Sequence, residues 1–298
     1  MGQIKLPQYY SYEQLKVECE RLAKEYKGFI KKVSIGKSWD NRELPMLLLG
    51  YGKSCVLLTG GVHGRESINP IVLLKMAERY GELTKNKLSA QGVCFEQWFA
   101  ENRLLIVPLL NPDGYEIALQ GFGRIQNEKL RRECERKAAL EQLKAVEWKY
   151  NGKGIDLNRN FPCKSWVSGF SGDIPASERE TKALIEVFQK YSPQLYIDYH
   201  SRERTIYYYR NAKEAIYNER QKQLARKLSK LTGYKLKEPG MEIVAGDRGG
   251  NTVHYASEYE NCPAFTIETV REEEEFPLNI CLQREVLREI WLTPFIRA

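Results

Sequence analysis

Residues 54–83 constrain the fold most, because they contain a strand, a tight turn and a helix in succession. Residues 54–59 have the apolar composition of a buried strand, and residues 69–83 repeat apolar side chains at helical spacing. Between them lies the glycine-rich turn Gly60-Gly61-Val62-His63-Gly64-Arg65-Glu66-Ser67. A buried strand that leads directly into a helix is the repeating unit of α/β sheets with helices on both faces.

The rest of the chain continues this alternation of strands and helices. Further strands are expected at residues 30–35, 44–49, 103–109, 194–199, 206–209 and 264–268. Further helices are expected at residues 11–26, 124–147, 177–191, 217–231, 252–259 and 280–292. We therefore predict a single α/β domain over residues 1–298.

Local signals mark several ends of these elements. Ser11 with Gln14, and Ser177 with Glu180, have the spacing of a capping box at the start of a helix. Residues 38–42 predict a hairpin turn between the first two strands. The composition of residues 111–115 predicts another turn, and residues 240–250 form a glycine-rich loop.

The charge and apolar content of the chain fit an ordinary folded protein. Its formal net charge of +7 is too mild and too dispersed along 298 residues to indicate nucleic-acid binding. Residues 1–7 show no secretion signal, and no apolar run is long enough to cross a membrane. The seven cysteines form no CxxC pair, which favours free thiols in a reducing compartment. We expect a cytoplasmic protein without nucleic-acid or membrane partners, and the oligomeric state stays open.

Three predicted strands end in side chains that bind metals or transfer protons. His63 and Glu66 follow the strand at residues 54–59, His200 follows a second strand, and Glu268 ends a third. The carboxyl ends of parallel strands meet at one edge of a sheet, so these side chains can converge. Two imidazoles and one carboxylate, with a position left for water, form the ligand set of a catalytic zinc. Glu268 is then the spare carboxylate that accepts a proton from the water.

Taken singly, these patterns have simpler interpretations. The spacing of His63 and Glu66 occurs often by chance, and His200 alone also fits a hydrogen-bonded histidine of the core. The combination with further motifs, in order along the chain, decides between these readings. Those motifs are Gly61-Val62-His63-Gly64-Arg65-Glu66, Asn111-Pro112-Asp113-Gly114-Tyr115, Gly154-Ile155-Asp156-Leu157-Asn158-Arg159-Asn160-Phe161, Ser177-Glu178, Ile197-Asp198-Tyr199-His200-Ser201, Gly249-Gly250 and Pro263-Ala264-Phe265-Thr266-Ile267-Glu268.

With these motifs the chain resembles the zinc carboxypeptidase family, of the carboxypeptidase A type, over nearly its whole length. The pieces Trp148-Lys149-Tyr150-Asn151 and Phe161-Pro162 resemble the bacterial branch that includes γ-D-glutamyl-diamino-acid peptidases and murein peptide amidases. The resemblance implies a mixed, mostly parallel twisted sheet of about eight strands, with helices on both faces.

The resemblance also implies roles for individual side chains. One Zn²⁺ per chain would be bound by His63, Glu66 and His200, with Glu268 as the general base. The carboxylate of the released residue would be held by Asn158 and Arg159, since an arginine fork matches a carboxylate. Further substrate contacts would come from Arg65 and Ser201, and Asp156 would orient His63. For Arg65 a solvated loop charge is the open alternative.

The cation that stabilises the oxyanion departs from the pattern of the digestive members, where an arginine follows a tryptophan. Here Lys149 follows Trp148 and is the candidate, with Arg124 and Arg131 as rivals. A lysine at this place also fits a solvated surface charge.

Substrate selectivity is suggested by the loop before the double glycine. Asp247 and Arg248 offer one anion and one cation there, which suits a zwitterionic side chain such as that of meso-diaminopimelate. His254, the third histidine, follows no ligand pattern and is expected to be a packing residue.

These observations predict a zinc metallopeptidase that hydrolyses a C-terminal amide bond with a zinc-activated water. The expected substrate is a peptide or muropeptide with a free C-terminal carboxylate, cleaved at a γ-D-glutamyl-diamino acid bond. The alternatives are a general metallocarboxypeptidase, and a protein side-chain deglutamylase or deacylase of the same fold. A catalytically silent relative that binds peptides or muropeptides is the alternative from another class. A serine hydrolase is disfavoured, because the sequence has no GxSxG elbow.

Overall fold

An eight-stranded sheet organises the computed structural model, which describes residues 3–169, 172–242 and 249–296. The strand order across the sheet is β1-β2-β6-β3-β7-β10-β8-β9. The strands are β1 (Ile30–Lys37), β2 (Glu43–Leu49), β3 (Ser54–Gly60), β6 (Asn102–Val107), β7 (Leu195–Ser201), β8 (Thr205–Tyr207), β9 (Lys235–Leu236) and β10 (Ala264–Thr269). A separate small ribbon pairs β4 (Ser89–Ala90) with β5 (Val93–Cys94).

The four central strands β6, β3, β7 and β10 run parallel, so their carboxyl ends lie at one edge of the sheet. The pairs β1–β2, β2–β6 and β8–β10 are antiparallel, and β8–β9 is parallel. The predicted mixed, mostly parallel sheet is therefore confirmed. Within the central strands, Glu268 pairs in register with His200, and Gly60 pairs with Tyr199.

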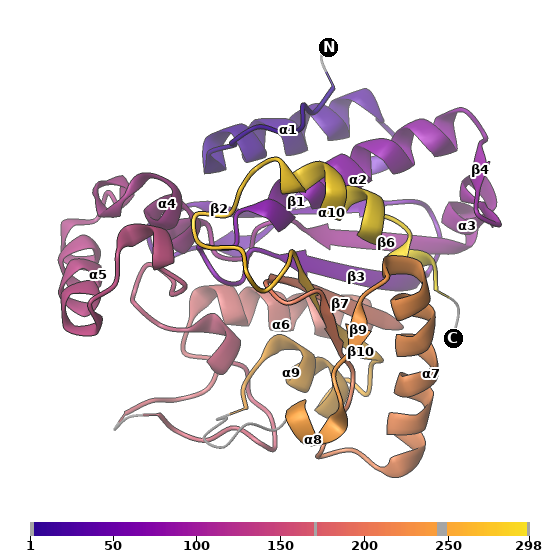
Figure 1. Ribbon diagram of the computed structural model, residues 1–298. Coiled ribbons are helices and arrows are strands. Elements are labelled where there is room, and N and C mark those ends of the chain that lie inside the picture. Colours follow the sequence, from indigo (N-terminus) through magenta and orange to yellow (C-terminus); the bar gives the residue numbers. More distant parts are fainter. Residues whose placement is uncertain (1–2, 170–171, 243–248, 297–298) are drawn as a thin grey trace.

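Helices cover both faces of this sheet. Figure 1 shows α1, α2 and α10 on one face and α6 and α9 on the other, with α7 beside the β8–β9 end. The helices are α1 (Tyr12–Glu25), α2 (Ile68–Lys85), α3 (Phe95–Glu101), α4 (Pro112–Gln120), α5 (Glu128–Glu141), α6 (Arg179–Tyr191), α7 (Ala215–Thr232), α8 (Pro239–Glu242), α9 (Thr252–Glu258) and α10 (Leu282–Ile290).

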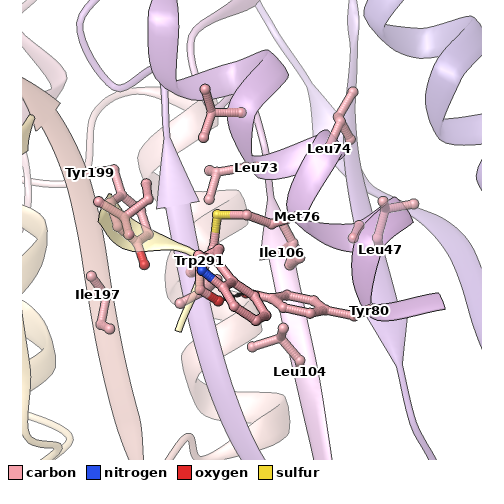
Figure 2. Packing of buried hydrophobic residues seen from close by; sticks show 14 of the residues in the cluster. Leu47, Leu73, Leu74, Met76, Tyr80, Leu104, Ile106, Ile197, Tyr199 and Trp291 are labelled. Carbon is pink, nitrogen blue, oxygen red and sulfur yellow. Dashed lines mark hydrogen bonds between the residues drawn. The ribbon is translucent and has the colours of Figure 1, made fainter. Parts of the chain in front are cut away.

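The central strands are apolar on both sides because both of their faces are covered. Successive residues alternate between the two layers. Leu58 and Ile106 pack in the cluster with α1, α2 and α10, whereas Leu57 and Leu105 pack in the cluster with α6 and α9. Figure 2 shows side chains of α2 lying against the strands of the first cluster.

Three local expectations differ from the structure. The predicted turn at residues 111–115 is the start of α4, because Asn111 caps the helix by accepting from the N–H of Gly114 at 2.9 Å and a proline fits its first turn. Helix α6 begins at Arg179 without a side-chain cap, so the capping box of Ser177 was wrong. The charged stretch at residues 124–147 is helical only over α5 and in short 3₁₀ turns.

Other local predictions are confirmed. Ser11 and Gln14 form the capping box of α1, and Gly233 ends α7 with a φ of 76°. All seven cysteines are free thiols. Among the described residues, none of the helices combines the length and the apolarity that crossing a membrane requires.

The buried carboxyl of Glu180 on α6 makes the stability of the fold depend on pH. Burial, reinforced by the charge of Asp113, raises the pKa of Glu180 to about 8 from an ordinary value of 4.5. The folded chain thus holds this proton more tightly than the unfolded chain, and the free energy of unfolding falls as pH rises from 4.5 towards 8.

We expect Glu180→Gln to remove this dependence, so that its free energy of unfolding rises relative to that of the wild type by about 4 kcal/mol between pH 5 and pH 8.5. Urea unfolding of the zinc-saturated proteins at both pH values measures the difference. Glu186→Gln, at an exposed position of the same helix, is the matched control and should follow the wild type. Parallel curves for Glu180→Gln and wild type would contradict the prediction.

Candidate metal and catalytic site

The loop between β3 and α2, which carries two of the predicted ligands, is packed tightly against two other segments. A Cβ added at Gly64 would lie 2.3 Å from the backbone of Gly114, so only glycine fits there. The side chain of Asn111 donates to the carbonyls of Val62 at 3.0 Å and Tyr150 at 3.1 Å. Two motifs that are distant in the sequence, around Asn111 and around Tyr150, therefore hold this loop in place.

Three ligand-type side chains converge at the carboxyl edge of the sheet. The Nδ1 atom of His63 lies 2.7 Å from Oε1 of Glu66 and 3.2 Å from Nδ1 of His200. The Nδ1 atom of His200 lies 3.1 Å from Oε2 of Glu66. Glu66 and His200 are buried, and His63 is half-buried. The structure thus brings together the three residues predicted to bind zinc.

A carboxylate lies behind each of the two imidazoles. The Nε2 atom of His200 is 2.9 Å from Oδ2 of Asp198, and Nε2 of His63 is 3.4 Å from Oδ1 of Asp156. Asp198 is held in place because it also accepts a hydrogen bond from the hydroxyl of Thr252. A carboxylate beside Nε2 keeps the ring proton on that atom and leaves the lone pair of Nδ1 directed at the shared point.

The donor set fits a divalent cation. The two Nδ1 atoms face each other at 3.2 Å, so their lone pairs repel unless a proton or a metal ion lies between them, and Oε2 of Glu66 is buried without a hydrogen-bond partner. Burial raises the pKa of Glu66, but the charges of His63 and His200 outweigh it and lower the pKa to about 2. Burial lowers the pKa of His200, but Asp198 and Glu66 hold it well above its usual range. The cluster therefore favours positive charge at its centre, which Zn²⁺ supplies with these ligand types.

Glu268 lies beside this cluster and lines the same cavity of about 860 Å³ as His63 and Glu66. Its Oε2 atom is buried without a hydrogen-bond partner. Burial, with a smaller contribution from the charge of Glu66, raises the pKa of Glu268 to about 8 against the opposing charges of His200 and His63. A carboxyl group that exchanges its proton near neutral pH is suited to general-base chemistry.

The wall of the cavity carries charges of both signs. The cations are Arg65, Lys144 and Arg202, and the carboxylates are Glu147, Glu272 and Glu275. The guanidinium of Arg65 lies 4.6 Å from the ring centroid of Phe276, and that of Arg202 lies 5.7 Å from the same ring. The cations of this wall can pair with an anionic group of a ligand while its carboxylates pair with a cationic group of the same ligand.

The predicted carboxylate-binding pair lies on the 3₁₀ turn Leu157–Arg159, which Asp156 caps. A guanidinium nitrogen of Arg159 donates to the carbonyl of Asn158 at 2.7 Å. Asp156 contacts His63, so the turn that carries Asn158 and Arg159 is joined through Asp156 to a predicted zinc ligand. Their roles in binding a substrate carboxylate stay predictions.

Lys149, the predicted oxyanion cation, pairs with the carboxylate behind His63. Its Nζ atom lies 2.7 Å from Oδ2 of Asp156. Burial raises the pKa of Asp156, but the hydrogen bond and charge of His63, with the charge of Lys149, hold it well below its usual range. The rival Arg124 pairs with Glu116 at 2.9 Å, and neither Arg124 nor Lys149 is among the residues that line the cavity.

Of the other residues predicted to contact substrate, two line the cavity and two lie outside the described residues. Ser201 lines the cavity, and its hydroxyl lies 2.9 Å from the hydroxyl of Thr269. Arg65 lines the cavity as well. Asp247 and Arg248 lie outside the described residues.

Asp198 and the cavity cations Lys144 and Arg202 have no role that was predicted from the sequence. Asp198 precedes His200 by two residues in one strand, so both side chains lie on the same face. That spacing was a usable signal for the partner of His200. Lys144 and Arg202 carried no signal, because only the folding of distant segments brings them to the cavity.

Comparison with known families agrees with this geometry. The family model described as zinc carboxypeptidase, Peptidase_M14, matches residues 15–293. This chain belongs to the zinc carboxypeptidase family. Zinc carboxypeptidases use one zinc at their catalytic centre, and His63, Glu66 and His200 are the candidate site for it here.

Individual zinc carboxypeptidases and their relatives resemble the chain at low identity. The γ-D-glutamyl-L-diamino acid endopeptidase 1 of Lysinibacillus sphaericus is 23% identical over 212 residues, which cover 67% of this chain and 52% of that protein. Bovine thrombin-activatable fibrinolysis inhibitor, solved with tick carboxypeptidase inhibitor, superposes with a TM-score of 0.76 at 20% identity, covering 96% of this chain and 95% of that chain. The murein-tripeptide amidase of Escherichia coli O157 superposes with a TM-score of 0.54 at 17% identity, covering 92% and 96%.

These matches confirm the predicted family and its fold. The chain spans about half the length of the curated relatives that it matches. The identities of the solved structures are low, so those structures show the zinc carboxypeptidase fold and leave the substrate to be proposed.

The carboxylates behind the imidazoles should control zinc affinity. We expect Asp198→Asn and Asp156→Asn each to weaken zinc binding by about 10- to 100-fold, because the amide no longer fixes the ring tautomer and its charge is lost. Competition with a chromophoric chelator at constant pH measures the affinity. Asp173→Asn, outside the cavity, is the control. Wild-type affinity in both variants would show that the two carboxylates do not support the ligands.

Proposed function

We propose that this chain is a zinc peptidase that hydrolyses the amide bond to a C-terminal residue. One observation carries the proposal. Two imidazole nitrogens and a buried carboxylate lie within 3.2 Å of one another, and His63 and Glu66 of this cluster line the same cavity as Glu268, whose buried Oε2 atom has no hydrogen-bond partner. Ligands for a Lewis acid and a separate proton acceptor are the two requirements of metal-assisted hydrolysis.

The zinc, when bound by His63, Glu66 and His200, supplies Lewis acidity that lowers the pKa of a water and polarises a carbonyl. In the proposed reaction Glu268 accepts the proton of the attacking water and returns it to the leaving amine. Asn158 and Arg159 hold the C-terminal carboxylate of the substrate, so the scissile amide lies over the cluster. A cation such as Arg65 of the cavity wall would balance the negative charge of the tetrahedral oxyanion, and Lys149, paired with Asp156 beside His63, is the sequence-based candidate for the same role.

The substrate we propose is a murein peptide cleaved at the bond between γ-D-glutamate and a diamino acid. The mixed charge of the cavity wall supports this, since cations such as Arg65 and carboxylates such as Glu272 can pair with both ends of a zwitterionic side chain. Two similar proteins, the γ-D-glutamyl-L-diamino acid endopeptidase 1 and the murein-tripeptide amidase, are named for such peptides. Asp247 and Arg248, a charge pair near the double glycine, are the sequence-based candidates for the same contact.

A panel of substrates tests the proposal with the zinc-loaded protein. It compares L-Ala-γ-D-Glu-meso-diaminopimelate with ordinary peptides that end in Lys or Phe, and with a peptide that carries glutamate on a side chain. We expect kcat/KM to be at least about tenfold higher for the murein peptide. Faster cleavage of the ordinary peptides would indicate a general carboxypeptidase, and faster cleavage of the side-chain conjugate a deglutamylase. Tight binding without any cleavage would indicate a silent binder.

A further inference from the structure

A second group of metal-ligating side chains lies outside the cavity. Cys163, His254 and Glu258 each offer a ligand atom, and the three atoms lie within 4.8 Å of one another. Cys163 belongs to the loop that follows Asn158 and Arg159. His254 and Glu258 are four residues apart on α9 and share one face of that helix.

The hydroxyl of Ser165 lies beside these three side chains and offers a fourth ligand atom. Oγ of Ser165 lies 3.3 Å from Sγ of Cys163, 3.4 Å from Nδ1 of His254 and 3.5 Å from Oε1 of Glu258. In a tetrahedral zinc site with bonds of about 2.0–2.3 Å, neighbouring ligand atoms are roughly 3.3–3.8 Å apart. The hydroxyl therefore stands at ligand-to-ligand distance from the other three atoms. Ser165 is exposed, which leaves a path for an ion to enter.

Backbone donors already orient two of these ligands. The N–H of Gly250 donates to Sγ of Cys163 at 3.1 Å, and the N–H of Lys164 donates to Oε2 of Glu258 at 2.6 Å. Burial raises the pKa of the Cys163 thiol, and the hydrogen bonds of Ser165 and Gly250 oppose that rise, so a bound metal ion would have to displace the thiol proton. The bond from Lys164 fixes the direction of the Glu258 carboxylate. One thiolate, one carboxylate and a neutral imidazole would together balance the charge of a divalent ion.

The electrostatics of His254 agree with this state. Burial, reinforced by the charges of Arg210 and Arg159, lowers the pKa of His254 to about 3. The imidazole is thus neutral at physiological pH, which is the form that binds metals. Because Arg210 and Arg159 repel a divalent ion as they repel a proton, the negative charges of Cys163 and Glu258 must outweigh them for the ion to bind.

We propose that Cys163, His254 and Glu258, with the hydroxyl of Ser165, bind a second Zn²⁺ that is structural rather than catalytic. A ligand set of sulfur, nitrogen and oxygen in tetrahedral arrangement suits zinc. A cysteine nucleophile activated by His254 is the weaker interpretation, because the side chain of Cys163 is buried and Ser165 lies beside it.

The second site lies between the loop after Arg159 and helix α9, where a bound ion would join the two segments. Its ion would join the loop after Asn158 and Arg159 to α9, whose first residue is Thr252. The N–H of Thr252 donates to Oδ1 of Asn158 at 3.3 Å, and its hydroxyl donates to Asp198 behind His200. The second ion would therefore hold the proposed carboxylate-binding turn against the support of the catalytic centre.

Metal content and cobalt spectra test the second site in the full-length protein. We expect two metal ions per chain in the wild type, and one per chain in Cys163→Ser and in His63→Ala. With Co²⁺, a thiolate-to-metal charge-transfer absorption should appear in the wild type and in His63→Ala but not in Cys163→Ser, since the catalytic ligands contain no sulfur. Cys55→Ser, at a buried cysteine of β3, is the matched control and should keep the absorption.

A second variant and an alkylation assay keep the second site testable if Cys163→Ser does not fold. Glu258→Gln should weaken cobalt binding at the second site by more than about tenfold, since even the loss of an outer partner has such an effect. Bound metal should protect Cys163 from alkylation. One ion per chain in the wild type without the sulfur absorption would overturn the proposal and leave a hydrogen-bonded cluster. Because Cys163 is buried, its alkylation is compared in the apo and zinc-loaded protein under conditions in which the apo protein reacts, and an equal rate there would overturn the proposal too.

Discussion

Glu268→Gln is expected to lower kcat/KM by about 10²- to 10⁴-fold while the protein keeps its catalytic zinc. Glutamine has nearly the same size as glutamate but cannot accept the proton of the attacking water. Because Glu268 is proposed to act beside the metal ligands and not as one of them, zinc affinity should stay close to that of the wild type. Steady-state kinetics on the murein tripeptide and metal analysis of the same samples give both quantities.

The matched control is Glu273→Gln, at an exposed position a few residues further along the chain. It changes the same chemical group outside the cavity and should keep wild-type kinetics. If Glu268→Gln retained most of its activity, another base would have to serve, and the proposed mechanism would fail. Loss of zinc from Glu268→Gln would instead make Glu268 a ligand.

His200→Ala is expected to lose the catalytic zinc and to reduce kcat/KM by more than about 10³-fold, because the Lewis acid contributes several kcal/mol. His200 is buried and is fixed by Asp198 on one side and Glu66 on the other. Its removal leaves His63 and Glu66 as an incomplete ligand set. A chelator should abolish the activity of the wild type, and added Zn²⁺ should restore it.

Added Zn²⁺ should not restore His200→Ala to wild-type activity. This result would distinguish a protein that lacks a zinc ligand from a wild-type protein whose zinc was removed by a chelator. His254→Ala is the comparison, as the third histidine of the chain. It should keep the chelator-sensitive zinc of the catalytic cavity, whatever happens at the second site. A His200→Ala protein that binds zinc as tightly as the wild type would refute the assignment of the ligands.

The strand, turn and helix that carry His63 and Glu66 could be predicted because their signals are local. Apolar runs, glycines and helical spacing act over a few residues, and the observed β3 and α2 follow them closely. Local signals were also misread where the same residues serve two structures. The sequence from Asn111 to Gly114 suits a turn, but it equally suits a capped helix start, and packing against Tyr150 favours the helix.

Partners that come from distant segments could not be predicted with the same certainty. Asp198 was visible two residues before His200, yet its role depends on the contact with Nε2. Lys144 and Arg202 reach the cavity only because the segment after α5 and the end of β7 lie near the same edge. The group of Cys163, His254 and Glu258 is likewise assembled from a loop and a helix almost 90 residues further on.

The sequence by itself determined the alternating strands and helices, the residues able to bind zinc, and the resemblance to the zinc carboxypeptidases. These follow from periodicity and from residue types at short spacing, which are properties of the chain before it folds. The tertiary structure alone decided which ring nitrogens face each other, which carboxylates stand behind them and which charges line the cavity. Those relations depend on packing and burial, because a side chain acquires its partners and its pKa only where the fold removes water and brings distant segments into contact.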